Sequence, residues 1–214
     1  MPTADPSLTS ARESAARRPD GTVRVLKESP DAGVYLARGE GGDAALVVAK
    51  RWRRTAWEWC KSLLGIAQPQ RQLRNAHRLL RASIATPAPI GGLRTVRGAG
   101  VVWFEIRLRW VEGEPLLERV RRADASELAR LGVAMRAILR QFAEAGLFNR
   151  DAKLSNWIVT PEGAIVAIDP VGVRSRRDPV REHERLAWSL ACELTQGERD
   201  RAQPFLAAAL ESSA

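Results

Sequence analysis

Residues 149–156 read NRDAKLSN, and residues 167–172 read AIDPVG. Between these polar clusters stand an apolar run, a Pro-Glu-Gly turn and a second apolar run, a pattern that predicts a short β-hairpin. A hairpin returns the chain to the edge at which it began, so we expect Asp169 to lie near Asn156 and Asp151. The stretch therefore predicts one region in which several polar side chains converge.

The side chains of this region are those that phosphoryl transfer requires. The reaction needs a carboxylate that orients the attacking hydroxyl, a cation on the phosphates and oxygen ligands for Mg²⁺. We predict that Asp151 orients the hydroxyl and that Lys153 neutralises charge on the transferred group. Asn156 and Asp169 are the predicted metal ligands. A pattern this short also occurs in ordinary surface loops, so the elements around it must support the interpretation.

The N-terminal half of the chain predicts an antiparallel sheet. Three β-type runs cover residues 23–27, 33–37 and 45–50, and the turn GEGGD precedes the third. Lys50 closes this third run, and we predict that it contacts the α- and β-phosphates of a nucleotide. Residues 90–111 predict two more strands across the turn RGAG.

Two helical stretches lie between these strands. Residues 52–66 mix Trp with Arg, and a second stretch begins at Pro69. In the second stretch Leu73, His77 and Leu80 recur at steps of three and four, which is the spacing of an amphipathic helix. The N-terminal half is thus predicted to combine several strands with helix.

The C-terminal half begins with a strong helix signal. Asp124 and Glu127 resemble a capping box, and Gly146 is the expected stop. Between them an apolar stripe recurs at helical spacing. Its members are Leu128, Leu131, Met135, Ile138 and Phe142. Residues 181–193 and 199–210 predict two final helices.

Composition narrows the classes of partner. Lys and Arg number 34 against 25 for Asp and Glu, and the net charge of +9 with a pI near 10.8 favours an anionic partner. The two cysteines are isolated, so neither a disulfide framework nor a zinc site is predicted. No apolar run approaches the ~20 residues that cross a bilayer. We expect a cytoplasmic protein, with a peripheral position on the inner membrane left open, and no nucleic-acid partner.

The order of these features resembles the protein-kinase superfamily, and more closely the bacterial lipopolysaccharide kinases that phosphorylate Kdo or heptose of the inner core. Four segments carry the resemblance: ALVVAKRW at 45–52, RQLRNAHRLLRASIATPAPIG at 71–91, GLFNRDAKLSNWIV at 146–159 and AIDPVGVR at 167–174. The resemblance spans roughly residues 23–194. It implies a kinase that uses ATP and Mg²⁺, with an anionic glycolipid sugar as the acceptor.

The resemblance also implies a bilobal α+β fold of the protein-kinase type. Residues 1–20 are expected to be a disordered tail, because they are rich in Ser, Ala, Pro and Arg without a sustained period. Residues 21–112 would form the N-lobe, an antiparallel sheet with helix that binds the nucleotide. Residues 113–214 would form a small, mostly helical C-lobe that carries the catalytic loop and the metal aspartate.

Several positions depart from the kinase pattern. Gln72 stands where a glutamate usually pairs with the lysine of the sheet, and we predict that it hydrogen-bonds Lys50. Asn149 replaces the usual histidine, and Pro170 follows the metal aspartate where phenylalanine is commonest. The turn KESPDAG carries a single glycine, so backbone approach to phosphates is less favoured. Two alternatives therefore remain: a compact Ser/Thr protein kinase, and a pseudokinase or anion-binding scaffold.

Two surface clusters allow more than one interpretation. The run VRSRR at 173–177 is suited to a carboxylate or phosphate of the acceptor, but arginines in loops are also ordinary solvated surface. Trp52, Trp57 and Trp59, among several basic residues, form either an interfacial face for anionic lipid or indoles packed on the sheet. The sequence favours the packed arrangement.

Overall fold

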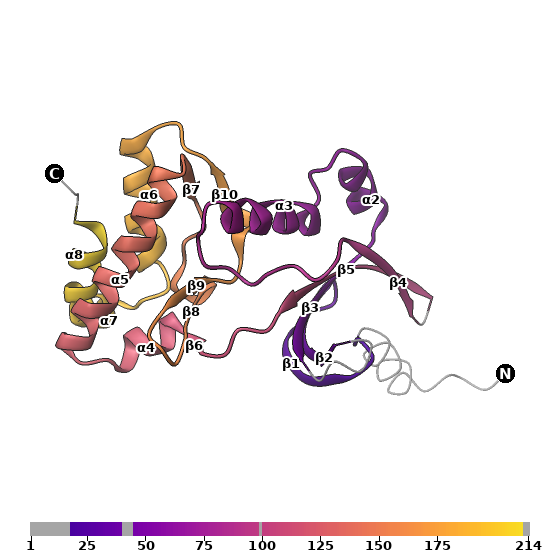
Figure 1. Ribbon diagram of the computed structural model, residues 1–214, viewed down its shortest axis with the longest axis horizontal. Coiled ribbons are helices and arrows are strands. Elements are labelled where there is room, and N and C mark those ends of the chain that lie inside the picture. The colour runs from indigo at the N-terminus through magenta and orange to yellow at the C-terminus, as the bar shows by residue number, and fades with distance from the viewer. Residues whose placement is uncertain (1–17, 40–44, 99, 212–214) are drawn as a thin grey trace. The chain divides into compact units, whose positions relative to one another are not determined.

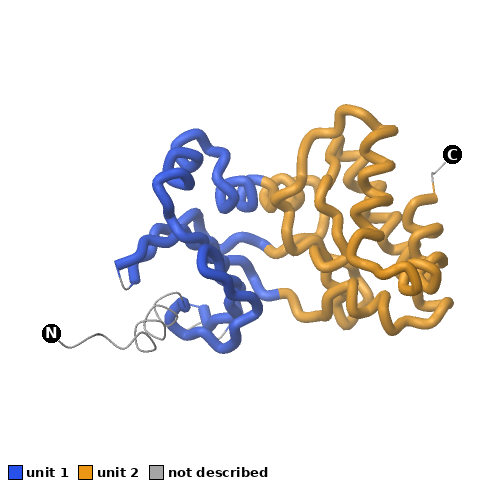
Figure 2. Tube along the Cα trace, turned by 180° about the vertical axis from the view of Figure 1, so that it is seen from behind, with its two compact units in different colours: residues 1–74, 88–110 blue, residues 75–87, 111–214 orange. Residues whose placement is uncertain are grey.

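The computed structural model describes residues 18–39, 45–98 and 100–211. The chain divides into two compact units, residues 1–74 with 88–110 and residues 75–87 with 111–214 (Figure 2). It is an α+β protein, with an antiparallel sheet in the N-terminal part and a mainly helical C-terminal part (Figure 1). Most of the expected tail and of the GEGGD turn lies outside the described residues, as does residue 99 of the RGAG turn.

A five-stranded antiparallel sheet forms the first unit, and its strands follow the order β1-β2-β3-β5-β4. The strands are β1 Thr22–Glu28, β2 Ala32–Arg38, β3 Leu46–Arg53, β4 Arg94–Gly98 and β5 Val101–Arg109. The five strands expected from the sequence are therefore confirmed. The central strand β3 pairs with β2 on one side and with β5 on the other, which fixes the position of Lys50 in the sheet.

The prediction that Lys50 closes its strand was wrong. β3 continues to Arg53, three residues further. In the sequence, a charged residue at position 51 suggests that the strand has ended. In the structure Arg51 is buried, and its Nε lies 2.6 Å from Oε2 of the buried Glu105 in β5. Nε of Arg107 lies 2.8 Å from the other carboxylate oxygen, so the charges are compensated and the strand pairing continues.

Two helices follow β3 in the chain, α2 Ala56–Leu63 and α3 Gln68–Arg81, and the boundary between the units falls inside α3. The buried face of α3 carries Gln72, Asn75, Ala76 and Leu79. The face expected from Leu73, His77 and Leu80 was wrong, because His77 and Leu80 are exposed. Two amides occupy buried positions, so an apolar pattern could not identify this face.

The second unit consists mainly of helices, with five short strands in a two-stranded sheet, β10-β7, and a three-stranded sheet, β6-β8-β9. Its larger helices are α4 Leu116–Arg122, α5 Ala125–Glu144, α6 Pro179–Ala191, α7 Gln196–Arg201 and α8 Gln203–Leu210. The strands are β6 Glu114–Pro115, β7 Leu147–Asn149, β8 Trp157–Val159, β9 Ile165–Ala167 and β10 Val173–Ser175. Two 3₁₀ turns, η1 Leu154–Asn156 and η2 Pro170–Gly172, complete it. The expected hairpin is confirmed as β8 and β9.

The long helix α5 begins at the predicted N-cap, Asp124, but only one of the two hydrogen bonds of the expected capping box is present among the described residues. The Asp124 side chain accepts a hydrogen bond from the backbone N–H of Glu127, while the Glu127 carboxylate accepts from the Arg119 guanidinium. The final helix, expected over residues 199–210, is instead two helices. Pro204 lies in the first turn of α8, where its missing N–H would break a continuous helix.

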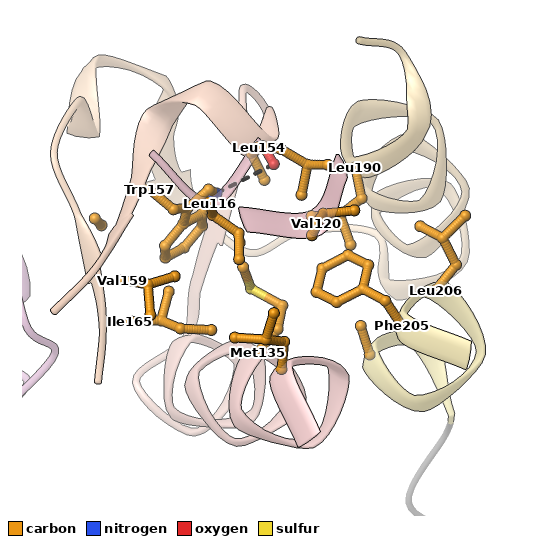
Figure 3. Packing of buried hydrophobic residues seen from close by; sticks show 14 of the residues in the cluster. Leu116, Val120, Met135, Leu154, Trp157, Val159, Ile165, Leu190, Phe205 and Leu206 are labelled. Carbon is orange, nitrogen blue, oxygen red and sulfur yellow. Dashed lines mark hydrogen bonds between the residues drawn. The ribbon is translucent and has the colours of Figure 1, made fainter. Parts of the chain in front are cut away.

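The core of the second unit lies between α5, the β8–β9 hairpin and α8. Trp157 is fully buried, and its indole N–H donates to the Ala152 carbonyl over 3.2 Å (Figure 3). Met135 of α5 and Phe205 of α8 are also fully buried in this cluster. α8 approaches α5 closely at Gly132, where an added Cβ would lie 2.5 Å from the Phe205 carbonyl oxygen. This core supports the loop between β7 and β8.

Within the part of the chain that the structure describes, no helix combines the length and the apolar character needed to cross a membrane.

Candidate functional site

The loop that holds Asp151 is anchored at its first residue. Asn149 ends β7, which pairs with β10 opposite Val173, and its side chain is buried. Its Oδ1 accepts a hydrogen bond of 3.1 Å from the backbone N–H of Asp151. Gly172 packs directly on this turn, because an added Cβ would lie 2.8 Å from Cβ of Asp151 and 2.6 Å from Oδ1 of Asn149. The side chain of Asn149 thus accepts from the backbone of Asp151 and orients it.

Asp151 and Lys153 lie beside each other at the surface of this loop. Nζ of Lys153 is 3.4 Å from Oδ1 of Asp151, and the two side chains are 40% and 44% exposed. An exposed pair of this kind contributes little to stability. It does place a carboxylate and an ammonium group where a solvent-borne substrate can reach both.

Asn156 closes the loop. Its Nδ2 donates a hydrogen bond of 2.9 Å to the carbonyl oxygen of Asp151, which leaves the amide oxygen Oδ1 as the group available to a metal ion. The backbone carbonyl of Asn156 accepts from the N–H of Ile168 over 2.9 Å, directly before Asp169. The β8–β9 hairpin therefore brings Asp169 back to the loop of Asp151 and Asn156.

Asp169 presents an unsatisfied oxygen. Its Oδ1 is buried and has no hydrogen-bond partner within the described residues. A buried carboxylate oxygen without a partner is unfavourable, and a bound cation would satisfy it. Carboxylate and amide oxygens are the ligands that Mg²⁺ takes in proteins, usually one or two from the protein with the rest from water and phosphates. Asp169 and Asn156 fit such an ion.

Asn75 of α3 holds the segment that follows Asp169. Its buried Nδ2 lies 2.8 Å from the carbonyl oxygen of Pro170 and 3.1 Å from that of Val173. The turn η2 is thereby fixed from a helix about a hundred residues earlier in the chain. Sequence analysis made no prediction for Asn75. Its position two residues before His77, within the expected helix, was the one hint that it could lie near the core.

Glu193, directly after α6, holds the other end of the loop. Its carboxylate accepts hydrogen bonds from the backbone N–H of Ser155 (2.8 Å) and from the Ser155 hydroxyl (2.6 Å). Sequence analysis missed this residue as well. In the adjacent Cys192, burial raises the pKa of the thiol and the charge of Glu193 raises it further. A raised pKa keeps the Cys192 thiol protonated near neutral pH and lowers its nucleophilicity.

The first unit contains the other two predicted site residues. Lys50 lies within β3, opposite Val34 of β2 and Ile106 of β5, and is half-buried. Gln72 is buried in α3, and its Nε2 has no hydrogen-bond partner in the described part of the chain. The predicted pairing of Gln72 with Lys50 stays a prediction, as does the contact of Lys50 with phosphates.

The basic run at 173–177 and the tryptophan cluster of Trp52, Trp57 and Trp59 differ in their surroundings. Arg174, Arg176 and Arg177 are exposed, and Nε of Arg176 lies 3.2 Å from the Glu182 carboxylate. The expectation that the indoles of the Trp cluster pack on the sheet was wrong for Trp57 and Trp59, which are both exposed. The helix α2 has no buried residue.

Comparison with known proteins gives no indication of function. No protein-family model matches the chain, and no curated protein matches it. The second unit brings together four of the predicted site residues in one loop region, with Asn75, Asn149 and Glu193 holding its backbone. The four residues are Asp151, Lys153, Asn156 and Asp169.

Proposed function

We propose that the chain is an ATP-dependent phosphotransferase of the protein-kinase-like fold that phosphorylates a sugar hydroxyl of lipopolysaccharide core, Kdo or heptose. The two compact units and the antiparallel sheet followed by helices are compatible with such a bilobal fold. The loop from Asn149 to Asn156 and the hairpin that leads to Asp169 supply the required groups in the expected order.

The single observation that carries this proposal is the buried, unpartnered oxygen of Asp169. A structural turn would satisfy this oxygen with a backbone N–H or a side chain, since buried polar groups are almost always paired. A backbone hydrogen bond joins the loop of Asn156 to the hairpin one residue before Asp169, and the hydrogen bond from Asn156 to Asp151 does not use the amide oxygen of Asn156. When bound there, Mg²⁺ would neutralise charge on the phosphates.

The remaining roles belong to the chain's own side chains. Asp151 accepts the proton of the attacking hydroxyl or orients it, and its exposure leaves it accessible to an acceptor. Lys153 stabilises charge on the transferred group. Lys50 contacts the α- and β-phosphates, as the resemblance implies. Gln72 can accept a hydrogen bond from a lysine through its amide oxygen but supplies no countercharge, so a modest rate is expected.

The class of acceptor is proposed from the charge of the exposed surface that follows Asp169. The exposed arginines at 174, 176 and 177 are suited to the carboxylate or phosphate of a glycolipid. A compact Ser/Thr protein kinase is the second enzymatic candidate, and a pseudokinase that binds anions without turnover is the third.

Labelled ATP separates these candidates directly. The purified protein is incubated with γ-labelled ATP and Mg²⁺, and separately with a core glycolipid, a protein mixture and water alone. Label in the glycolipid supports the proposal, whereas label in protein supports the second candidate. Release of phosphate alone, or no turnover, contradicts transfer to a sugar.

The variant Asp169→Asn tests the role of the buried Asp169 oxygen by thermal stability, measured with and without Mg²⁺ and ATP. The substitution removes an unpaired buried charge, so the metal-free variant should unfold at the same temperature as the parent chain or higher. It should lose the stabilisation by Mg²⁺ and ATP, which for saturation a hundredfold above Kd is about 2.7 kcal/mol. The exposed Asp200→Asn is the matched control and should keep that stabilisation. An unchanged ligand response in Asp169→Asn would remove the metal from the proposal.

A further inference from the structure

The helix α2 has its apolar and polar sides reversed relative to an ordinary surface helix. Trp57 is 69% exposed, and Leu64, which caps the C-terminal end of the helix, is 73% exposed. Glu58, Lys61 and Ser62 are the half-buried residues of the same helix. A surface helix normally buries its apolar stripe and exposes its charges. The exposed side of α2 therefore needs an explanation.

The exposed residues form one continuous face. Successive residues of an α-helix are about 100° apart, so the exposed side chains fill a single arc of roughly 160°. In order around the helix they are Trp59, Leu63, Cys60, Leu64 and Trp57. Ile66, just beyond the helix, is 51% exposed. We call Trp57, Trp59, Leu63, Leu64 and Ile66 the α2 face.

Cations border this apolar face at three points. Nζ of Lys61 lies 5.2 Å from the ring centre of Trp57, and the guanidinium of Arg54 lies 5.8 Å from that of Trp59. Nη1 of Arg74 donates to the Gly65 carbonyl over 3.1 Å, at the end of the helix. Exposed cation–π pairs of this kind hold a positive charge at the edge of an indole.

Basic residues predominate in the sequence around the α2 face, although Arg51 is buried and paired with Glu105 and Arg53 lies 3.8 Å from Asp31. Residues 45–74 contain seven basic residues and one acidic residue, Glu58, whose carboxylate lies 2.6 Å from Lys61. The seven are Lys50, Arg51, Arg53, Arg54, Lys61, Arg71 and Arg74. Within the described residues, neither Arg54 nor Arg74 has a carboxylate within ion-pair distance. The border of the face is thus complementary to an anionic surface.

We propose that the α2 face lies in the interface of an anionic lipid bilayer, with the indoles and leucines among the upper acyl chains and the cations at the phosphates. Tryptophan is enriched at this depth, where its ring is apolar and its N–H remains near the headgroups. Basic residues beside such a face add electrostatic attraction to anionic lipid. The inference rests on α2 and its neighbours and does not depend on phosphate transfer.

Charge argues against the other occupants. A second copy of the chain would place the same face against itself in a two-fold dimer, which would bring the cations of both copies together. A nucleic acid would stack on the two indoles but would gain little from two leucines and an isoleucine. A bilayer of anionic lipid accommodates both the aliphatic side chains and the positive border.

The experiment measures binding of the full chain to vesicles without nucleotide. Vesicles of phosphatidylglycerol with phosphatidylcholine are compared with vesicles of phosphatidylcholine alone, by co-sedimentation and by the blue shift of tryptophan emission. We expect binding to the anionic vesicles that weakens as NaCl rises from about 0.05 M to about 0.5 M, because salt screens the cations. Equal binding to both vesicles would contradict the role of the positive border.

The variant Trp57→Ser with Leu64→Ser removes apolar side chains that are mostly solvent-exposed, so the fold should be retained. Its affinity for anionic vesicles should fall by roughly tenfold or more. Trp188→Ser is the matched control, because Trp188 in α6 is 59% exposed and also carries an arginine, Arg185, at 5.6 Å from its ring. The control should bind vesicles as the parent chain does.

Three outcomes would overturn the inference. The first is full vesicle binding by the double variant, and the second is an equal loss in Trp188→Ser. The third is no vesicle binding by the parent chain, together with a concentration-dependent dimer in light scattering that the double variant abolishes, which would assign the α2 face to a second copy. Melting curves of all variants show whether each remains folded.

Discussion

The carboxylate of Glu193 accepts two hydrogen bonds from Ser155, one from its backbone N–H at 2.8 Å and one from its hydroxyl at 2.6 Å. The two residues are 38 positions apart, and Ser155 lies in η1 between Asp151 and Asn156. A carboxylate that binds both groups fixes the loop more firmly than a neutral acceptor would. Glu193 is therefore a positioning residue for the candidate site.

We predict that Glu193→Ala lowers kcat for phosphate transfer by roughly tenfold to a hundredfold, because the loop is then less well positioned. KM for ATP should change less, since Glu193 does not touch the nucleotide in this assignment. Glu193→Gln keeps acceptor capacity and should retain more activity than the alanine variant. Steady-state kinetics measure whether kcat changes more than KM. Equal changes in kcat and KM would contradict a positioning role.

Asn75 gives a prediction about stability. Asn75→Ala removes the side-chain donor from the carbonyl oxygens of Pro170 and Val173, of which Pro170 keeps the backbone N–H of Val173, and should lower the free energy of unfolding by about 1–3 kcal/mol. Asn75→Asp should cost more, because it points a buried carboxylate at those carbonyls. Urea unfolding measures both. The exposed His77→Ala, two residues on, should stay within about 0.5 kcal/mol of the parent chain.

Substitution of Gly172 is predicted to reduce activity while the fold is retained. An added Cβ would lie 2.9 Å from the backbone nitrogen of Asp151, so Gly172→Ala should displace the loop and reduce phosphate transfer strongly. Gly197→Ala is the control, because its Cβ meets no heavy atom within 4 Å. That variant should be as active as the parent chain. Activity equal to the parent in Gly172→Ala would show that the Asp151 backbone is not tightly placed.

Glu198 predicts a dependence of stability on pH. Its carboxylate accepts from the backbone N–H of Thr195 over 2.8 Å and from Nε of Arg121 over 3.0 Å. The backbone hydrogen bond of Thr195 is the largest cause that holds the pKa of Glu198 below its ordinary value of 4.5. Because the pKa is lower in the folded state, this contribution to stability is fully present above about pH 4.5 and is lost as the pH falls through the folded pKa.

The variant Glu198→Gln cannot ionise and checks this sign. It should be less stable than the parent chain near about pH 7, and the difference should shrink as the pH falls below about 4. Unfolding by urea at several pH values measures it. A difference that grows toward acid would contradict the lowered pKa.

Local patterns in the sequence identified most of the elements. The strands of the sheet follow from runs of β-type residues, and α5 follows from an apolar stripe that begins after Asp124. The polar residues of the candidate site are also close in the chain, between Asn149 and Asp169. Such features depend on neighbours a few residues away, so their spacing is visible in the sequence.

Contacts across the chain could not be identified in this way. The buried face of α3 carries Gln72 and Asn75, because Asn75 binds carbonyls 95 and 98 residues later. Arg51 continues β3 because Glu105 compensates its charge from another strand. In both places a polar side chain is buried by a distant partner, and hydrophobic spacing alone assigned it to the surface or to a strand end.

What the sequence alone determined is therefore the order of the elements and the set of polar side chains gathered between residues 149 and 169. The tertiary structure decided that Asp169 has a buried oxygen without a partner among the described residues, that Glu193 and Asn75 hold its surroundings, and that α2 turns its tryptophans outward. The reason is physical: spacing along the chain sets which side chains share a face. Whether that face is covered, paired or left to solvent depends on atoms brought there by distant segments.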